Sequence, residues 1–345
     1  MEYVKEININ EAVIHILDSN SDEVIINEYP LELNDEIYAF LMKHIQKSLN
    51  DEELRYAVFN QGRGILKEIS QEYLNGENNI IEVSKELARQ MFQLMKANGN
   101  IPSCDLIIVS ISTEFGVMLA ILKMDYVKNY THNINFVENK IGINIIPQFT
   151  GLPNGGQKIQ KCAFIKPSRE ENDFDLMVID KQNKGKENED YGTNYFISNF
   201  LGCSIINNER DMTKGLLKAA EKWTRDNYKE DADKAEVIRS AIKKKLKSEE
   251  NIEIKDLSED IFKDQFEAQK NFIEYVSGQG VENNVSVDKE WVDKKLKRVR
   301  LKIDKDIDLY INEETYDDIA RFEIVRNGDG TINMIIKHVS NYIEK

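Results

Sequence analysis

The side chains best suited to chemistry by type and spacing are basic residues in the C-terminal part of the chain. Lys214, Lys218, Lys222, Arg225 and Lys229 follow one another at intervals of four, four, three and four residues. In an α-helix this spacing places all five cations on one face. A row of cations on a rigid helix attracts phosphate groups, because it replaces the counterions that surround them.

A second basic segment begins at residue 289. There, Arg298, Arg300 and Lys302 alternate with apolar residues, so a strand would present the three cations on one face. Residues 214–247 contain 11 basic and 6 acidic residues, and residues 289–305 contain 8 and 3, so each segment has a net charge of +5. The candidate phosphate contacts are Lys214, Lys218, Lys222, Arg225, Lys243, Lys244, Arg298, Arg300 and Lys302.

The charge of the whole chain points the other way. Its 345 residues include 46 Lys and Arg against 61 Asp and Glu, a net charge of −15. This excludes a uniformly basic nucleic-acid-binding protein. Residues 1–36 alone hold ten acidic residues and one Lys. Two alternatives to phosphate binding therefore stay open. In the first, the basic side chains are simply solvated, and acids such as Glu221 balance their charge. In the second, the acidic N-terminal surface docks DNA-handling proteins without direct DNA binding.

Enzyme motifs are incomplete in this sequence. There is no phosphate-binding loop of the form G-x4-G-K-[ST], the four histidines are scattered, and no CxxC pair occurs. Asp173, Asp175, Asp180 and Lys181 have the composition of a Mg²⁺-dependent nuclease site. However, Asp180 and Lys181 are adjacent, so they would point to opposite faces of a strand. We expect no enzyme activity, no metal site and no cofactor, with a nuclease as the weaker alternative.

The hydrophobic pattern predicts an α+β fold of two domains. The first, residues 1–205, is expected to be an acidic α+β domain with a mainly antiparallel sheet covered by helices. Its helices are predicted over 35–49, 81–97 and 195–201. Its strands include 7–16 and the β-rich stretches LIIVSIS, VMLAILKM, INFVEN, IGINIIPQF and DLMVIDKQ.

The second domain, residues 206–345, is expected to be helical and β, and to carry the basic segments. Helices are predicted over 211–228, 231–246 and 258–276, followed by a strand over 298–311. The chain ends in a hairpin whose turn is Asn-Gly-Asp-Gly. The sequence shows neither a secretory signal nor an apolar stretch of membrane-spanning length.

Four stretches together resemble the bacterial nucleoid-associated protein family: STEFGVMLAILKMDYV (112–127), DLMVIDKQ (175–182), YFISNFLGC (195–203) and NERDMTKGLLKAAEKW (208–223). The resemblance extends over most of the chain in the same order. It implies a cytoplasmic protein associated with chromosomal DNA in the nucleoid, with no established enzyme activity and no catalytic residues to transfer. We accordingly expect double-stranded DNA as the partner, bound without sequence specificity, and leave open whether the protein is a homodimer.

Overall fold

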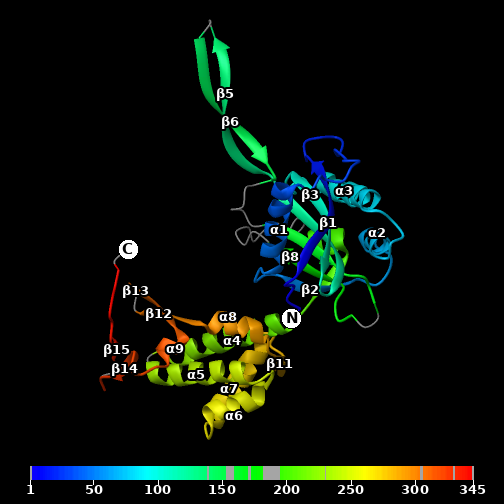
Figure 1. Ribbon diagram of the computed structural model, residues 1–345. Coiled ribbons are helices and arrows are strands. Elements are labelled where there is room, and N and C mark those ends of the chain that lie inside the picture. Colours follow the sequence, from blue (N-terminus) through cyan, green and yellow to red (C-terminus); the bar gives the residue numbers. More distant parts are fainter. Residues whose placement is uncertain are drawn as a thin grey trace. The chain divides into compact units, whose positions relative to one another are not determined.

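A computed structural model describes residues 2–137, 140–152, 159–169, 172–181, 195–229, 231–303, 306–328 and 331–343. The chain divides into two units, residues 2–206 and residues 207–345. Residues 182–192, whose Gly, Asn and charged residues predict a surface loop, lie outside the described residues. Figure 1 shows the elements of each unit in their sequence colours.

A seven-stranded sheet forms the centre of the first unit, in the order β1-β3-β4-β7-β8-β2-β9. Every neighbouring pair is antiparallel, which confirms the predicted α+β class and sheet type. The strands are β1 (Ile7–Leu17), β2 (Arg55–Phe59), β3 (Cys104–Thr113), β4 (Gly116–Asp125), β7 (Lys161–Ile165), β8 (Leu176–Asp180) and β9 (Cys203–Ile206).

Helices cover both faces of this sheet (Figure 1). On one face, α2 (Ile65–Leu74), α3 (Ile80–Ala97) and the π-helical turn η1 (Tyr195–Leu201) bury their apolar side chains against alternate sheet residues. On the other lies α1 (Asp35–Leu49). As predicted, α1 begins after Asn34, whose side chain accepts a hydrogen bond from the Ile37 N–H at 2.9 Å.

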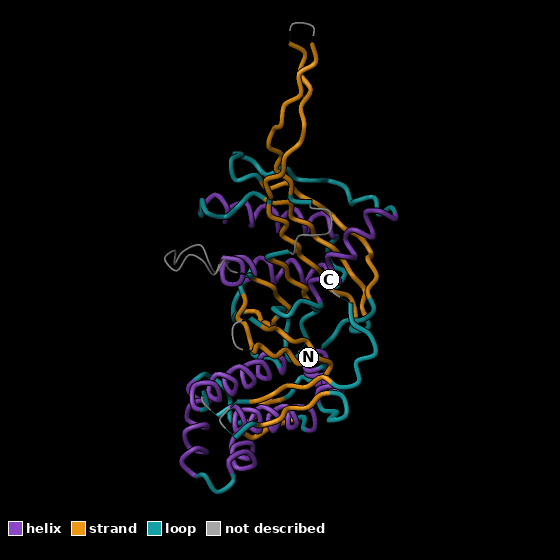
Figure 2. Tube along the Cα trace, turned by 90° about the vertical axis from the view of Figure 1, so that its left-hand side faces the viewer, coloured by secondary structure: helices purple, strands orange, loops and turns teal. Residues whose placement is uncertain are grey.

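The next two strands correct the sequence prediction. INFVEN and IGINIIPQF were expected in the sheet, but β5 (Val127–Val137) and β6 (Lys140–Thr150) form a separate two-stranded hairpin. Figure 2 shows its two strands running away from the sheet. We call this hairpin the arm. The β-rich composition correctly predicted strands, but composition does not identify the neighbour of a strand.

The second unit is built on a helical core. An aromatic group holds it together: the Trp223 ring lies 5.1 Å from Phe262 and 5.2 Å from Phe272, both edge-on. The helix predicted over 258–276 is in fact two helices, because Lys263 has φ 45° and interrupts the helical backbone. The elements are α4 (Glu209–Asn227), α5 (Ala232–Ser248), β10 (Asn251–Glu253), α6 (Ile254–Phe262), α7 (Phe266–Gly278), β11 (Asn284–Ser286) and α8 (Lys289–Leu296).

Two hairpins follow the helical core. The single strand predicted over 298–311 is a pair, β12 (Arg298–Ile303) and β13 (Ile307–Asn312), with Ile303 opposite Ile307. The continuous alternation of apolar and charged residues concealed the turn between them. After α9 (Glu313–Tyr316), the predicted final hairpin is confirmed as β14 (Phe322–Arg326) and β15 (Ile332–Ile336).

Candidate nucleic-acid interface

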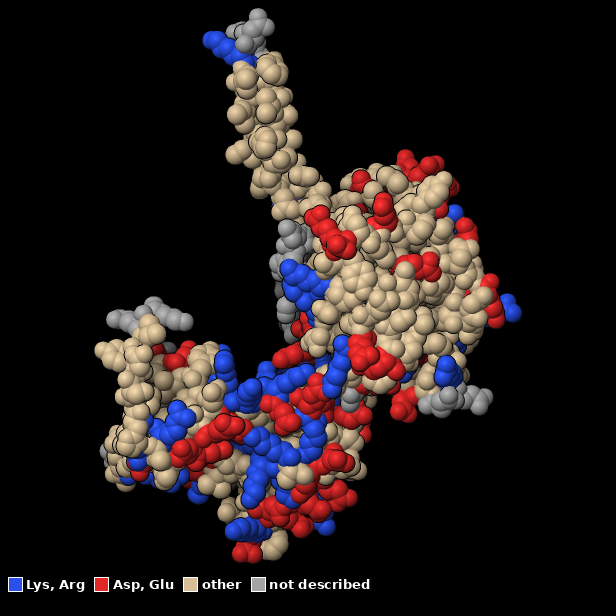
Figure 3. All heavy atoms as spheres, in the orientation of Figure 1, with Lys and Arg blue, Asp and Glu red and all other residues tan. Residues whose placement is uncertain are grey.

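The basic face of α4 is positioned by the helix's own cap and apolar stripe. Asn208 begins the helix by accepting a hydrogen bond from the Asp211 N–H at 2.8 Å. Leu216, Ala220 and Trp223 are buried in the core of the unit. The cations therefore face outward: Lys218, Lys222 and Arg225 are exposed, and Lys214 is half-buried. We call these four residues the α4 stripe, and Figure 3 shows Lys and Arg gathered over this unit among acidic side chains.

Aromatic rings support two members of the stripe. The Lys214 ammonium lies 5.8 Å from the ring centre of Trp291 on α8, and that of Lys222 lies 5.9 Å from the ring of Tyr275 on α7. A ring face attracts a cation without cancelling its charge, and the long alkyl stem packs on the apolar surface. Neither ring contact cancels the positive charge of its lysine.

Glu221, the acid of α4 that lies between Lys218 and Lys222 in sequence, forms an ion pair with a residue of another helix. Glu221 accepts two hydrogen bonds from the Arg239 guanidinium of α5, at 2.7 and 2.8 Å. This pairing raises the pKa of Arg239, chiefly through the hydrogen bonds from the guanidinium to Glu221. Among the residues that the structure describes, neither Lys218 nor Lys222 forms an ion pair. The sequence alternative in which Glu221 balances the stripe is therefore not what the geometry shows.

At its C-terminal end, the stripe is only weakly compensated. Arg225 approaches Asp226 at 4.0 Å, with the two side chains 66% and 43% exposed. An ion pair at this distance and exposure contributes little, because solvent screens it. Arg225 can therefore exchange this contact for a phosphate at small cost.

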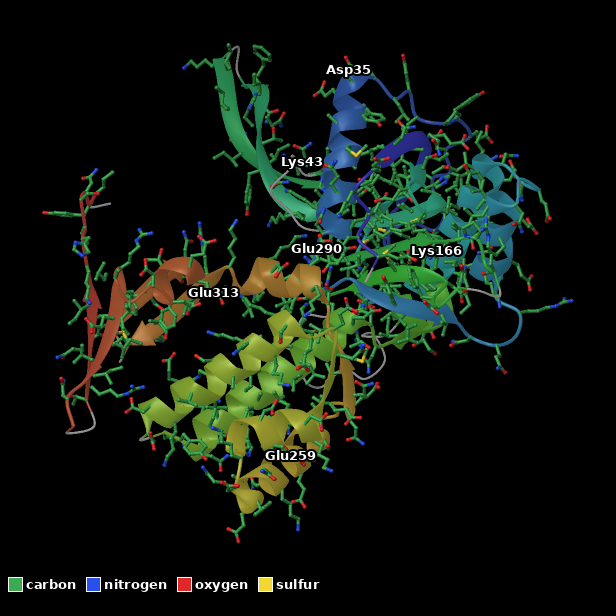
Figure 4. All side chains as sticks on the ribbon, turned by 60° about the horizontal axis from the view of Figure 1, so that its bottom comes forward. Asp35, Lys43, Lys166, Glu259, Glu290 and Glu313 are labelled. Carbon is green, nitrogen blue, oxygen red and sulfur yellow. The ribbon has the colours of Figure 1, made fainter. Side chains whose placement is uncertain are left out.

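The basic residues at the end of α5 divide into two groups. Lys245 pairs with Glu249 and Asp260, each at 2.6 Å, and Lys247 pairs with Glu313. Lys243 and Lys244 form no ion pair within the described residues. Figure 4 labels Glu313 on α9, the acid that forms the ion pair with Lys247. Of the four, Lys243 and Lys244 are the two that form no ion pair among the described residues, so they remain candidate phosphate contacts.

The strand cations lie on one face of β12, as predicted, but the one acid of β13, Asp308, partly neutralises them. Arg300 pairs with Asp308 at 3.1 Å and lies 5.2 Å from the ring centre of Tyr310. Lys302 stands directly opposite Asp308 in the hairpin register, and Arg298 stands opposite Asn312. Arg300 stands opposite Tyr310 and reaches Asp308 diagonally, so of the three strand cations only Arg298 neither faces Asp308 nor pairs with it.

The structure brings the two basic segments together at α8. Lys214 of α4 lies against Trp291 of α8. Lys289, the first residue of α8, donates hydrogen bonds to the carbonyls of Leu246 and Lys247 at the end of α5, at 3.0 and 2.9 Å. The start of α4, the end of α5 and α8 therefore meet, whereas β12 pairs with β13 and contacts α9.

One contributor was missed by the sequence analysis. Arg239 was not selected, because its partner Glu221 lies 18 residues away on the preceding helix. Spacing rules for a single helix reach only three or four residues. The signal that could have found the pair is the apolar pattern of α4 and α5, which packs the two helices together as a helical hairpin.

The carboxylate and lysine group considered as a nuclease site is not assembled. Asp180 pairs with Lys161, and Lys181 pairs with Asp51 at 2.6 Å. Burial raises the pKa of Asp180. Asp175 accepts a hydrogen bond from the Phe59 N–H at 2.8 Å. No group of three His, Cys, Asp or Glu side chains that could hold a metal ion occurs among the residues described.

Comparison with protein families identifies the chain's relatives. The family model described as nucleoid-associated protein YejK matches residues 13–344, which is nearly the whole chain. The chain belongs to this family. The resemblance drawn from the four sequence stretches is thereby confirmed, and with it the association with the nucleoid that the family's description states. A comparison with curated proteins finds no match.

Membership of a nucleoid-associated family bears on how the basic residues are distributed over the surface. A nucleoid-associated chain with a net charge of −15 must localise its basic residues if it is to approach DNA. The meeting of α4, α5 and α8 is the place where the structure gathers them. Within the described part of the chain, no helix has both the length and the apolar character needed to cross a membrane.

Proposed function

We propose that this protein binds double-stranded DNA in the bacterial nucleoid, in the cytoplasm, through phosphate contacts from its C-terminal unit. It acts by binding and not by catalysis. The observation that carries the proposal is the Glu221–Arg239 pair. Because Arg239 pairs with Glu221, and no described acid forms an ion pair with Lys218 or Lys222, the charge of both ammonium groups is available to a ligand.

The geometry of the α4 stripe suits an extended polyanion. Lys214 and Arg225 are eleven residues apart on one helix, which corresponds to about 16 Å along its axis. Duplex DNA carries roughly nine phosphate charges over such a length, so a straight row of cations meets several of them. Lys243 and Lys244 extend the row where α5 approaches α8.

The stripe can contact DNA through the charges of its Lys and Arg side chains, and this determines the sequence specificity that we expect. Lys and Arg bound to phosphate oxygens position a protein on DNA but carry no sequence information. All four residues of the stripe are cations, so we propose binding with little sequence preference. The strand cations Arg298, Arg300 and Lys302 would contribute less, because Asp308 already attracts two of them.

The rest of the unit limits the binding surface. Residues 249–282, which include α6 and α7, contain ten acidic and three basic residues. This segment repels phosphates, so DNA would lie along α4, the end of α5 and α8 rather than wrap the unit. The binding should accordingly be local and sensitive to salt.

A charge-reversal experiment tests the proposal. Fluorescence anisotropy with a labelled duplex compares wild type with the double variant Lys218→Glu, Lys222→Glu. The matched control is Lys255→Glu, Lys270→Glu, which changes the same charge at exposed helical lysines of α6 and α7. We expect the stripe variant to bind at least about tenfold more weakly, since two phosphate contacts are lost. Equal losses for both variants would contradict the assignment of the stripe.

A further inference from the structure

The arm has two chemically different faces. In the antiparallel register of β5 and β6, opposite residues share a face: Ile134 pairs with Ile143, Phe136 with Ile141, and Tyr130 with Pro147. The opposite face is mainly polar and carries Asn129, Thr131, Asn133, Asn135, Asn144 and Gln148, together with Val127 and Ile146. Lys128 and His132 lie on the apolar face, opposite Phe149 and Ile145. This alternation is the pattern of a sheet that is covered on one side and solvated on the other.

Nothing in the described chain covers the apolar face. Its seven large side chains are between 52% and 78% exposed: Tyr130, Ile134, Phe136, Ile141, Ile143, Ile145 and Phe149. The strands of the arm pair only with each other among the described residues. Figure 3 shows the arm as an almost continuous uncharged surface.

The size of this face matches that of a protein interface. A large side chain offers roughly 150 to 250 Å², so seven of them at these exposures present on the order of 900 Å². A typical monomer exposes no apolar patch above about 600 Å², whereas a standard interface buries about 800 Å² on each partner. A two-stranded hairpin is also only marginally stable alone in water. The arm therefore needs a partner that covers its apolar face.

The chemistry of the arm points to a second copy of the same chain. Its two strands hold only two charged residues, Lys128 and Lys140, in a chain that is 31% charged. It therefore has no charge pattern with which to select DNA or an acidic protein. An apolar ribbon is self-complementary across a two-fold axis, where one patch meets its own copy.

The base of the arm fixes its direction relative to the sheet. The Asp105 carboxylate accepts hydrogen bonds from the Tyr126 hydroxyl, at 3.2 Å, and from the Gly151 N–H. Tyr126 precedes β5 and Gly151 follows β6, so one buried carboxylate ties both ends of the arm to β3. The arm is thus presented from a fixed base, as an interface element must be.

We propose that the protein is a homodimer in which the apolar faces of two arms pack against each other. This inference stands apart from DNA binding, because no residue of the α4 stripe belongs to the arm. A dimer would carry two stripes on one assembly, so a single molecule could contact two DNA segments.

Molar mass measured by light scattering or sedimentation tests the proposal, at about 50 µM, where standard-size interfaces are commonly occupied. One chain has a mass of 40.0 kDa, so wild type is expected at twice that value. The double variant Ile143→Asn, Ile145→Asn should fall to 40.0 kDa. The control Asn133→Ser, Asn144→Ser, on the polar face of the same strands, should remain dimeric. A monomeric wild type, or a dimeric Ile143→Asn, Ile145→Asn variant, would overturn the proposal.

Cross-linking adds a readout that does not depend on removing apolar side chains. The three native cysteines, Cys104, Cys162 and Cys203, are buried, so an introduced thiol on the arm is the exposed one. A short bis-maleimide should link Ile145→Cys into a covalent dimer, but should leave Asn133→Cys as single chains. Equal cross-linking of the two variants would contradict packing through the apolar face. Duplex affinity at low salt, measured on the same samples, reports separately on the α4 stripe.

Discussion

Glu221 on α4 and Arg239 on α5 form a bidentate ion pair, with hydrogen bonds of 2.7 and 2.8 Å. The pair removes from the basic helix the acid that would otherwise lie within one turn of Lys218 and Lys222. Its contribution to function is electrostatic: it decides how much positive charge α4 presents. The pair also joins two helices that pack against each other in the core of the unit.

This pair predicts opposite effects for its two members. Glu221→Gln should raise DNA affinity, because it removes an acid from the helix and releases Arg239. Arg239→Gln should lower it, because it leaves Glu221 uncompensated beside the stripe. A unit charge acting over about 8 Å through water changes an interaction by about 0.5 kcal/mol, roughly twofold in affinity. Anisotropy titrations at low salt measure both, and changes of the same sign would contradict the account.

The sequence did not predict the Glu221–Arg239 pair, whereas it predicted much of the local structure. Asn34 followed by Asp35 and Glu36 predicted the start of α1 because a helix cap is a local feature. The spacing of the lysines likewise predicted the exposed face of α4. The Glu221–Arg239 contact required the packing of two helices, which spacing within one helix does not encode.

The arm shows the same limit for strands. The β-rich composition of INFVEN and IGINIIPQF correctly predicted two strands, whose Ile134, Phe136, Ile141 and Ile143 share one face in the structure. It could not tell whether that face is covered by helices of the same chain. Similarly, the run from Arg298 to Ile311 keeps its alternation through a turn, so a hairpin was mistaken for one strand.

The base of the arm has a steric requirement that can be tested. A Cβ atom added to Gly151 would lie 2.5 Å from both the Asp105 carboxylate and the Met124 carbonyl oxygen. Gly151→Ala should therefore lower the free energy of unfolding by about 1 to 3 kcal/mol, as overpacking usually does. In the arm itself, Gly142→Ala is the control, since its Cβ would meet only the Asn135 carbonyl at 3.5 Å. Urea unfolding of the three proteins gives the comparison, and equal stabilities would refute the steric argument.

A buried histidine predicts a pH dependence of stability. His15 is buried, and its Nδ1 accepts a hydrogen bond from the Asn27 N–H at 3.1 Å. Burial, aided by Lys85 and Arg89, lowers the pKa of His15 from 6.5 to about 4. The unfolded chain therefore takes up a proton below pH 6.5 that the folded chain does not, so stability falls as the pH drops from 6.5 to 4. The loss from this residue reaches up to about 3 kcal/mol.

The variant His15→Asn isolates this contribution, because the asparagine oxygen can accept the same hydrogen bond without titrating. Urea unfolding at pH 6.5 and 4.5 should show a smaller fall for the variant than for wild type. Identical falls would mean that His15 titrates alike in the folded and unfolded chains.

The arrangement around β8 predicts that the protein does not cut DNA. Asp180 and Lys181 are each paired with a different side chain, Lys161 and Asp51 respectively. A nuclease needs carboxylates and a lysine directed at one Mg²⁺ and one water. Supercoiled plasmid incubated with the protein and Mg²⁺ should stay supercoiled on an agarose gel. Nicked or linear product, absent when EDTA replaces Mg²⁺, would instead show a metal-dependent activity.

The salt dependence of DNA binding is the sharpest test of phosphate contacts from α4. For contacts with phosphates, the logarithm of the binding constant falls linearly with the logarithm of the salt concentration, by about 0.9 for each phosphate neutralised. Wild type and the variant Lys218→Gln, Lys222→Gln are compared on one labelled duplex. We predict a linear dependence for wild type and a slope smaller by about 1.8 for the variant. Equal slopes for the two proteins would contradict DNA binding through α4.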